Sequence, residues 1–231
     1  MKNFNQIGMR EENTDKLLIS ATDLNIVFDG DSLTFGIGAT SSQDYPDYIK
    51  DKIESSFNTF TFNSFGVSGQ NTQDMIADAV TQIDPLVNVS KYNLLVGWED
   101  VNAILNDSRT AQQNFDDFQS YYATRRAAGF DYLVHVVGYY PRLKLNDTYN
   151  QPTWNDTLFD IQEEYRELCR NAVNPNWDIL VDLTINPVLG GQRAQYVNNF
   201  FFDSVHLTTK GYDEAGEWIL QNGILQNFKV Q

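Results

Sequence analysis

The stretch LNIVFDGDSLTFG, residues 24–36, joins a short apolar run to a polar turn. An apolar run rich in branched side chains is typical of a strand that is covered on both faces, as in a parallel sheet. Gly30 permits the tight turn that follows, and a serine in such a turn can present its hydroxyl above the edge of the sheet. The stretch therefore predicts a buried parallel strand whose end carries Ser32.

Further apolar runs follow along the chain at 59–63, 93–97, 132–138 and 178–183. They alternate with segments of helical length at 42–57, 72–83, 111–128, 155–173 and 208–226. Alternating strands and helices favour right-handed crossovers and a parallel sheet covered by helices on both faces. We therefore expect an α/β fold, a three-layer α/β/α sandwich with a mainly parallel sheet of about five strands, of flavodoxin-like type. No repeat or linker interrupts it, so we expect a single domain over 1–231, of which 1–22 form an N-terminal extension.

The chain is strongly acidic, with 31 Asp and Glu against 16 Lys and Arg and a formal net charge of -15. Such a polyanion is a poor partner for nucleic acid or for an anionic membrane surface, because both bind through Lys and Arg. No segment reaches the roughly 18 apolar residues of a membrane span, and the N-terminus lacks the apolar core of a secretory signal. We expect no nucleic-acid partner and no membrane span, and a protein that is cytoplasmic or part of a larger assembly such as a phage appendage. The oligomeric state stays open.

Several residues at the predicted strand ends could carry chemistry. The backbone N–H of Ser32 could point at a developing oxyanion, although a serine there could instead cap the next helix. Gly66, in FNSFGVSGQNT, could offer a second N–H donor or serve as a plain turn residue. Asp203 and His206 are three residues apart, and that spacing lets a carboxylate hold an imidazole. The other histidine, His135, lies inside an apolar run, where a hydrogen-bonded core histidine is expected.

Three of these segments, in this order, resemble the SGNH hydrolases, also called the GDSL lipase/esterase family. The family's first block resembles DGDSLTFG, its second FGVSGQNT, and its last, D-x-x-H, resembles Asp203-Ser-Val-His206. The resemblance implies a serine esterase with Ser32 as nucleophile, His206 as base and Asp203 as the carboxylate that orients it. It also implies that the N–H groups of Ser32 and Gly66 form the oxyanion hole. We expect no cofactor, and Cys169, in a helical pattern, is expected to be an inert thiol.

The third block departs from the family pattern G-x-N-D, because the chain reads Gly97-Trp98-Glu99-Asp100. Glu99 takes the place of the asparagine whose amide donates to the oxyanion, and an ionised carboxylate can only accept hydrogen bonds. Glu99 could be protonated and donate, could turn away from the oxyanion hole, or could weaken catalysis. A fourth alternative joins Glu99, Asp100 and Asp203 as ligands of a hard cation, but we expect no metal.

The substrate is expected to be a small acyl ester, and an O-acetyl group on a carbohydrate is the preferred class. Aromatic side chains near a cleft can stack on sugar rings, so Trp98, Tyr139 and Tyr140 are candidate substrate contacts, although rings also pack cores. Arg142, and Arg193 on a later loop, could hold an anionic group of the substrate. The alternative is a binding module, an SGNH-like domain that holds a glycan or a protein partner without turnover.

Overall fold

The parallel sheet that the apolar runs predict forms from five strands in the order β2-β1-β3-β4-β5. The structure is a computed structural model that describes residues 23–141, 156–191 and 198–226. The strands are β1 (Asp23–Gly30), β2 (Thr59–Gly66), β3 (Tyr92–Trp98), β4 (Tyr132–Val137) and β5 (Ile179–Asp182). Each neighbouring pair is parallel, so the carboxyl ends of all five strands lie at one edge of the sheet.

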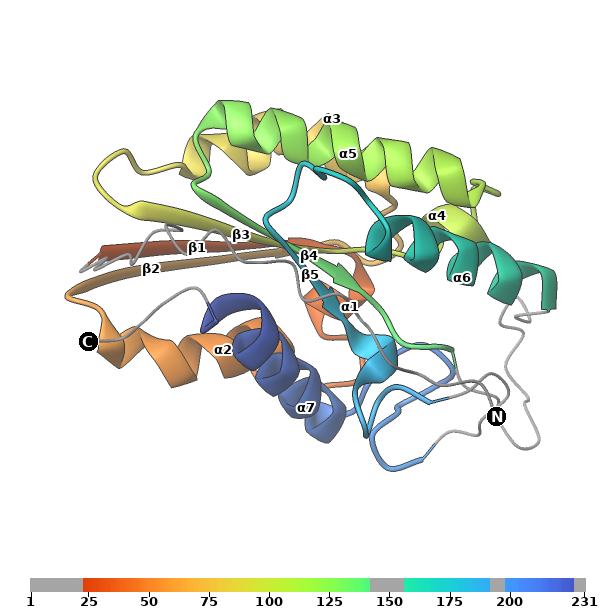
Figure 1. Cartoon of the computed structure of the whole chain (residues 1–231). Helices are drawn as coiled ribbons and strands as arrows, with labels where there is room; N and C mark the ends of the chain where they lie inside the picture. Colours follow the sequence, from red (N-terminus) through yellow and green to blue (C-terminus); the bar gives the residue numbers. More distant parts are fainter. Residues whose placement is uncertain (1–22, 142–155, 192–197, 227–231) are drawn as a thin grey trace, which may run out of the picture.

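Helices cover both faces of this sheet (Figure 1). On one face lie α2 (Tyr45–Ile53) and α7 (Thr209–Ile219), and on the other lie α3 (Thr72–Gln82), α5 (Ala111–Ala128) and α6 (Asp156–Arg170). Short helical turns, α1 (Ser32–Phe35) and α4 (Asn102–Leu105), come next in the chain after β1 and β3. The three-layer α/β/α fold is therefore confirmed.

Successive residues of each central strand face opposite layers, and this alternation divides the core in two. Leu24, Ile26 and Phe28 of β1 pack in a cluster with residues of α2 and α7. Val27 of the same strand packs with residues of α3, α5 and α6. The apolar run of β1 is thus explained, because both of its faces are buried from Leu24 to Gly30.

The helix boundaries follow local capping signals. Thr110 begins α5 with a capping box, in which its side chain accepts from the Gln113 amide and the Gln113 side chain accepts from the Thr110 amide. Gly129 ends the same helix in the left-handed conformation that glycine adopts without strain. Asn71 begins α3 with a second capping box. The predicted helices over 111–128 and 72–83 agree with these limits to within one residue.

The second strand differs from the expectation of a doubly buried run. β2 is an edge strand, and none of its residues is fully buried. Its sequence TFTFN alternates polar and apolar residues, which is the usual pattern of a half-exposed strand.

Among the helices in the described ranges, none is long and apolar enough to cross a bilayer.

Candidate active site

Ser32 is the first residue of α1, immediately after the turn that ends β1. Asp31 caps this short helix, since its Oδ1 accepts from the Leu33 amide at 2.8 Å. Gly30 is required in the turn, because a Cβ there would lie 2.3 Å from the Trp98 carbonyl oxygen and 2.4 Å from Thr34 Oγ1. Close backbone approach and a capped turn thus fix Ser32 at the carboxyl edge of the sheet.

The structure brings Ser32, His206 and Asp203 into one hydrogen-bonded chain. Ser32 Oγ lies 2.9 Å from His206 Nε2, and His206 Nδ1 lies 2.7 Å from Asp203 Oδ2. If Nδ1 carries the proton that Asp203 accepts, Nε2 is left with the lone pair that can accept from the serine hydroxyl. Residues 174 positions apart in the sequence therefore meet as a nucleophile and a base, with a carboxylate behind the base.

The loop that carries the base is held by hydrogen bonds within the loop, two of them to the Asp203 side chain. Asp203 Oδ1 accepts from the amides of Val205 and His206 at 2.8 and 2.7 Å, and the His206 carbonyl accepts from the Phe202 amide at 2.9 Å. Burial raises the pKa of Asp203, but the hydrogen bonds from the His206 ring and from these amides outweigh it and hold the pKa below its ordinary value. Asp203 thus stays ionised and can stabilise a protonated imidazole.

Gly66 ends β2 directly beneath the nucleophile's helix. A Cβ at this position would lie 2.0 Å from the Phe35 amide nitrogen and 2.4 Å from the carbonyl carbon of Thr34. The sequence left two roles open for this residue, an oxyanion donor and a turn residue. The structure adds a further reason for glycine, which is close backbone packing. Glycine at 66 is required because the backbone of α1 passes over it.

The carboxylate of Glu99 is turned to the amides of α4, one of the alternatives left open by the sequence. Its Oε1 accepts from the amides of Val101, Asn102 and Ala103 at 2.9, 2.5 and 3.3 Å. Its Oε2 accepts from the Thr72 hydroxyl at 2.9 Å. Burial and the neighbouring Asp100 raise the pKa of Glu99. Both oxygens of Glu99 are therefore engaged by groups of α3 and α4, and its place in the oxyanion hole stays a prediction.

The amide side chain that lies beside the serine turn belongs to Asn102, which the sequence analysis missed. Asn102 Nδ2 donates to Asp31 Oδ2 at 3.0 Å and to the Gln70 carbonyl oxygen at 2.9 Å, so it joins the first and second blocks. The missed signal was an asparagine three residues after the expected position, just ahead of the apolar pair Ala103-Ile104.

The aromatic residues predicted to contact substrate are mostly structural. Trp98 is fully buried and packs against the rings of Tyr45 and Tyr139. Tyr139 is buried too, and its hydroxyl donates to the Val205 carbonyl at 2.6 Å, which supports the histidine loop. Both rings fill the core in this structure, and the role of Trp98 and Tyr139 as substrate contacts stays a prediction.

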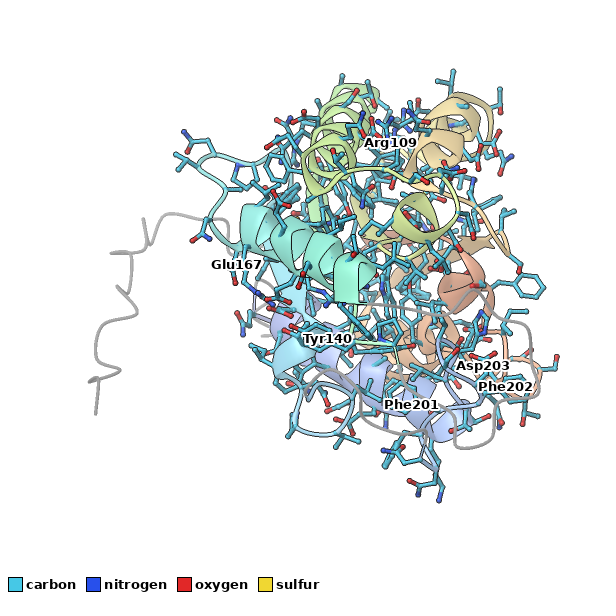
Figure 2. The ribbon with its side chains drawn as sticks, turned by 90° about the vertical axis from the view of Figure 1, so that its right-hand side faces the viewer. Arg109, Tyr140, Glu167, Phe201, Phe202 and Asp203 are labelled. Atoms are coloured by element: carbon cyan, nitrogen blue, oxygen red, sulfur yellow. The ribbon has the colours of Figure 1, made fainter. Side chains whose placement is uncertain are left out.

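Tyr140 is only half-buried, but its hydroxyl donates to Glu163 of α6 and its ring covers the Arg166 guanidinium, 4.6 Å from the ring centroid. Figure 2 shows Asp203 and Phe202 together and Tyr140 toward α6. Arg142 and Arg193 lie outside the described residues.

The acids once considered as metal ligands have other partners. Asp100 Oδ2 accepts from the Gly138 amide at 2.9 Å and lies 3.5 Å from the buried Arg166 guanidinium. Glu99 caps α4 and Asp203 holds His206, as described above. Within the ranges that the structure describes, no group of three His, Cys, Asp or Glu side chains could hold a metal ion.

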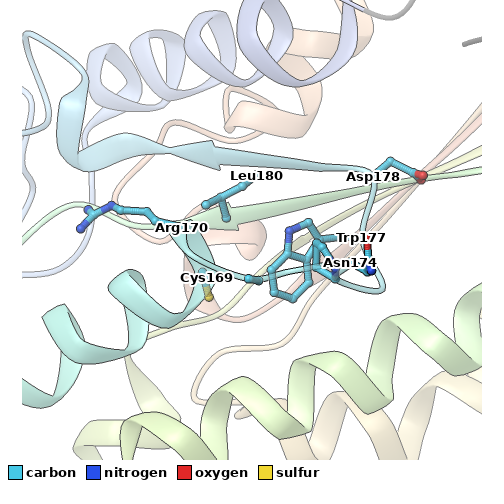
Figure 3. A pocket seen from close by; sticks show the side chains of 8 residues that line it. Cys169, Arg170, Asn174, Trp177, Asp178 and Leu180 are labelled. Atoms are coloured by element: carbon cyan, nitrogen blue, oxygen red, sulfur yellow. The ribbon is translucent and has the colours of Figure 1, made fainter. Parts of the chain in front are cut away.

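The two remaining candidate residues, His135 and Cys169, are core residues. His135 is fully buried, its ring nitrogens lie 3.2 Å from the Tyr122 hydroxyl and 2.8 Å from that of Tyr165, and burial lowers its pKa to about 3. Burial raises the pKa of Cys169 to about 12, so its thiol stays protonated and unreactive. Cys169 also borders a pocket of about 430 Å³, between the end of α6 and the start of β5 (Figure 3). This pocket lies at the amino edge of the sheet, whereas Ser32 lies at the carboxyl edge.

Comparison with known proteins finds one family model and several similar solved structures. The model of the GDSL-like lipase/acylhydrolase family matches residues 28–214. A lipase/acylhydrolase from Enterococcus faecalis is similar in structure, with a TM-score of 0.58 at 17% identity over 85% of this chain and 93% of that one. An acetyl xylan esterase from Geobacillus stearothermophilus has a TM-score of 0.58 at 14% identity, over 86% and 93% of the two chains. A lipase from a goat rumen metagenome reaches 0.59 at 17% identity, over 90% and 100%. No curated protein matches the sequence.

A parallel sheet with a serine and a histidine at its carboxyl edge defines the class of α/β hydrolytic enzymes. The chain belongs to the GDSL-like lipase/acylhydrolase family and is a carboxylic ester hydrolase.

Proposed function

We propose that the chain hydrolyses O-acetyl esters of carbohydrates, with Ser32 as nucleophile, His206 as general base and Asp203 as the carboxylate that orients the base. The observation that carries the proposal is the continuous chain of hydrogen bonds, 2.9 Å from Ser32 to His206 and 2.7 Å from His206 to Asp203. The serine hydroxyl attacks the ester carbonyl while His206 Nε2 takes its proton. The same nitrogen then returns the proton to the leaving alcohol, and water releases the acid from the serine by the same steps.

The oxyanion that forms on attack needs hydrogen-bond donors, and three are available in this proposal. Ser32 and Gly66 supply backbone N–H groups. Asn102 supplies the side-chain amide that position 99 does not, because one of its two N–H bonds can transfer from the Gln70 carbonyl to the oxyanion. The amides of α4 hold the Glu99 carboxylate and stabilise its charge, which reduces its repulsion of the oxyanion.

The carbohydrate part of the proposal has two supports. Among the similar structures is an acetyl xylan esterase from Geobacillus stearothermophilus. In addition, two exposed aromatic rings belong to the segments that carry the nucleophile and the base: Phe35 of α1 is 59% exposed, and Phe202, next to Asp203, is 57% exposed. Phe202 packs against the turn that follows α1, where a Cβ at Gly38 would lie 2.6 Å from its Cβ. Exposed rings of this kind can stack on the apolar face of a sugar.

The test is the hydrolysis of p-nitrophenyl acetate by the purified protein beside its Ser32→Ala variant at equal concentration. We expect clear turnover that disappears in the variant. Release of acetate from acetylated xylooligosaccharides, compared with release of butyrate from a tributyrin emulsion, then tests the substrate class. Equal rates for Ser32→Ala and the unmodified chain would overturn the catalytic proposal, and preference for the emulsion would overturn the carbohydrate assignment alone.

A further inference from the structure

Helix α4 has an unusual beginning. A helix leaves its first amides without partners inside the helix, and a side chain at the capping position normally supplies an acceptor. Here the capping residue is Val101, which has no side-chain hydrogen bond to offer. Instead Glu99 Oε1, from just outside the helix, accepts from the amides of Val101, Asn102 and Ala103. One carboxylate oxygen therefore organises the whole start of α4.

The helix that Glu99 organises carries the amide of Asn102. The shortest of the three bonds, at 2.5 Å, is to the backbone N–H of Asn102 itself. The side chain of the same residue reaches Asp31 Oδ2 and the Gln70 carbonyl oxygen, on the loops that follow β1 and β2. A displacement of the first turn of α4 would therefore move the Asn102 amide away from the serine turn.

The other carboxylate oxygen fixes the direction of the Glu99 side chain. Oε2 accepts from the hydroxyl of Thr72, at the start of α3, and Thr72 Oγ1 also lies 2.9 Å from Asn114 Oδ1 of α5. Glu99, Thr72 and Asn114 are all fully buried. Buried polar networks hold one arrangement because any rotation leaves unpaired groups in a site without water. The side chain is thus anchored to two further helices on the α3 and α5 face of the sheet.

We infer that Glu99 is a positioning residue, which acts through the amides of α4 to aim the Asn102 side chain at the oxyanion. This inference rests on the proposed function, because it assigns Asn102 a donor role in the same site. An acceptor at position 99 then supports the oxyanion hole, because the first turn of α4 depends on it. A shorter side chain at that position would release the helix that carries the Asn102 donor.

The inference is tested by three substitutions of graded length and acceptor capacity. Glu99→Gln keeps a side-chain oxygen for the amides of α4, and its NH2 can donate to Thr72 Oγ1, so we expect it to keep most of the turnover. Glu99→Asn is one methylene shorter and Glu99→Ala has no acceptor. Both are expected to lower kcat by about 10- to 100-fold with little change in KM, which is less than the roughly 100- to 1,000-fold effect of deleting a donor. If Glu99→Ala does not fold, the pair Glu99→Gln and Glu99→Asn decides.

A double variant separates positioning from general destabilisation. Because Glu99 acts through Asn102, we expect Glu99→Asn combined with Asn102→Ala to be no slower than Asn102→Ala alone. If the loss of kcat in the double variant equals the product of the losses in the two single variants, the inference is overturned. An increase of kcat in Glu99→Asn would overturn it as well.

A second readout does not depend on turnover. In an amide ¹H–¹⁵N NMR spectrum, the side-chain signals of Asn102, assigned by their loss in Asn102→Ala, should be shifted and protected from exchange in the unmodified chain and in Glu99→Gln. They should move to the positions of a free amide in Glu99→Asn. Unchanged Asn102 signals in Glu99→Asn would overturn the inference even if Ser32→Ala had already shown that the proposed function is wrong.

Discussion

Asp203 does two separate tasks with its two oxygens. Oδ1 accepts from the backbone amides of Val205 and His206, and Oδ2 accepts from the His206 ring. An asparagine at this position could keep the first set of bonds, because its carbonyl oxygen can take the place of Oδ1. Its NH2 group would face His206 Nδ1 and would favour the tautomer in which Nε2 carries the proton.

We therefore predict that Asp203→Asn keeps the melting temperature and loses turnover. The wrong tautomer cannot accept the serine proton, and a loss of roughly 10,000-fold in kcat is expected from the behaviour of such triads. Steady-state kinetics on p-nitrophenyl acetate and a thermal melt by circular dichroism check the two parts. A loss below tenfold would show that the carboxylate is not what orients His206.

At the scale of single residues, the sequence predicted the three residues that are joined by hydrogen bonds at the candidate active site, but not all of the residues around them. Ser32, Asp203 and His206 stand in short motifs, so their local context was visible before their contact was known. Asn102 was missed because its position in the site depends on how α4 is capped, which no spacing rule reports. The burial of Trp98 and Tyr139 could not be predicted, because burial is decided by packing between elements, and an aromatic residue at a strand end carries no sign of which side its ring takes.

Among the elements, the strands were predictable and the single-turn helices were not. β1 was expected at 24–29 and forms over Asp23–Gly30, since an apolar run of branched residues has few alternatives to a buried strand. α1 and α4 have four residues each, which is about one turn, so no periodicity can reveal them. They form because Asp31 and Glu99 accept from their first amides.

The contact between α1 and β2 yields a prediction for Gly66. In Gly66→Ala the new methyl group would overlap the backbone of Phe35, so α1 must shift and carry Ser32 with it. We expect a destabilisation of about 1–3 kcal/mol, the usual cost of overpacking, and a larger fall in kcat/KM than the stability change explains. Urea unfolding and esterase kinetics measure the two effects.

Gly69→Ala is the matched control. Gly69 has a positive φ of 83° but nothing within 4 Å of a Cβ, so alanine there strains the backbone without displacing α1. It should lose stability by about 1 kcal/mol and keep its turnover. Equal losses of activity in the two variants would show that the approach of α1 to Gly66 does not position the nucleophile.

For the whole molecule, acidity and burial together predict how stability depends on pH. Burial raises the pKa of Asp29, which is only 3% exposed and accepts from the Tyr121 hydroxyl, from 3.8 to about 7. The folded chain then binds a proton that the unfolded chain has released, so this group lowers the free energy of unfolding as the pH rises from about 4 to about 7. The net charge of -15 acts in the same direction through self-repulsion.

We therefore predict a higher melting temperature at pH 5 than at pH 8, measured by calorimetry at constant ionic strength. Asp29→Asn removes one titrating group and keeps an acceptor for Tyr121, so it should reduce the difference between the two pH values. Added salt should reduce only the part that comes from net charge. A melting temperature that rises from pH 5 to pH 8 would show that the ionised groups of the folded state dominate instead.

The loop from Phe201 to Leu207 closes on itself, with Phe201 and Leu207 paired as a bridge and the Phe202 amide bonded to the His206 carbonyl. The carboxylate and the imidazole are thus assembled within one short segment, whereas the serine belongs to α1, directly after β1. Local opening of that segment would withdraw both groups at once and leave the strands paired. We therefore expect activity to be lost on heating before the strands unfold and to return on cooling, as far as this segment opens independently of the sheet.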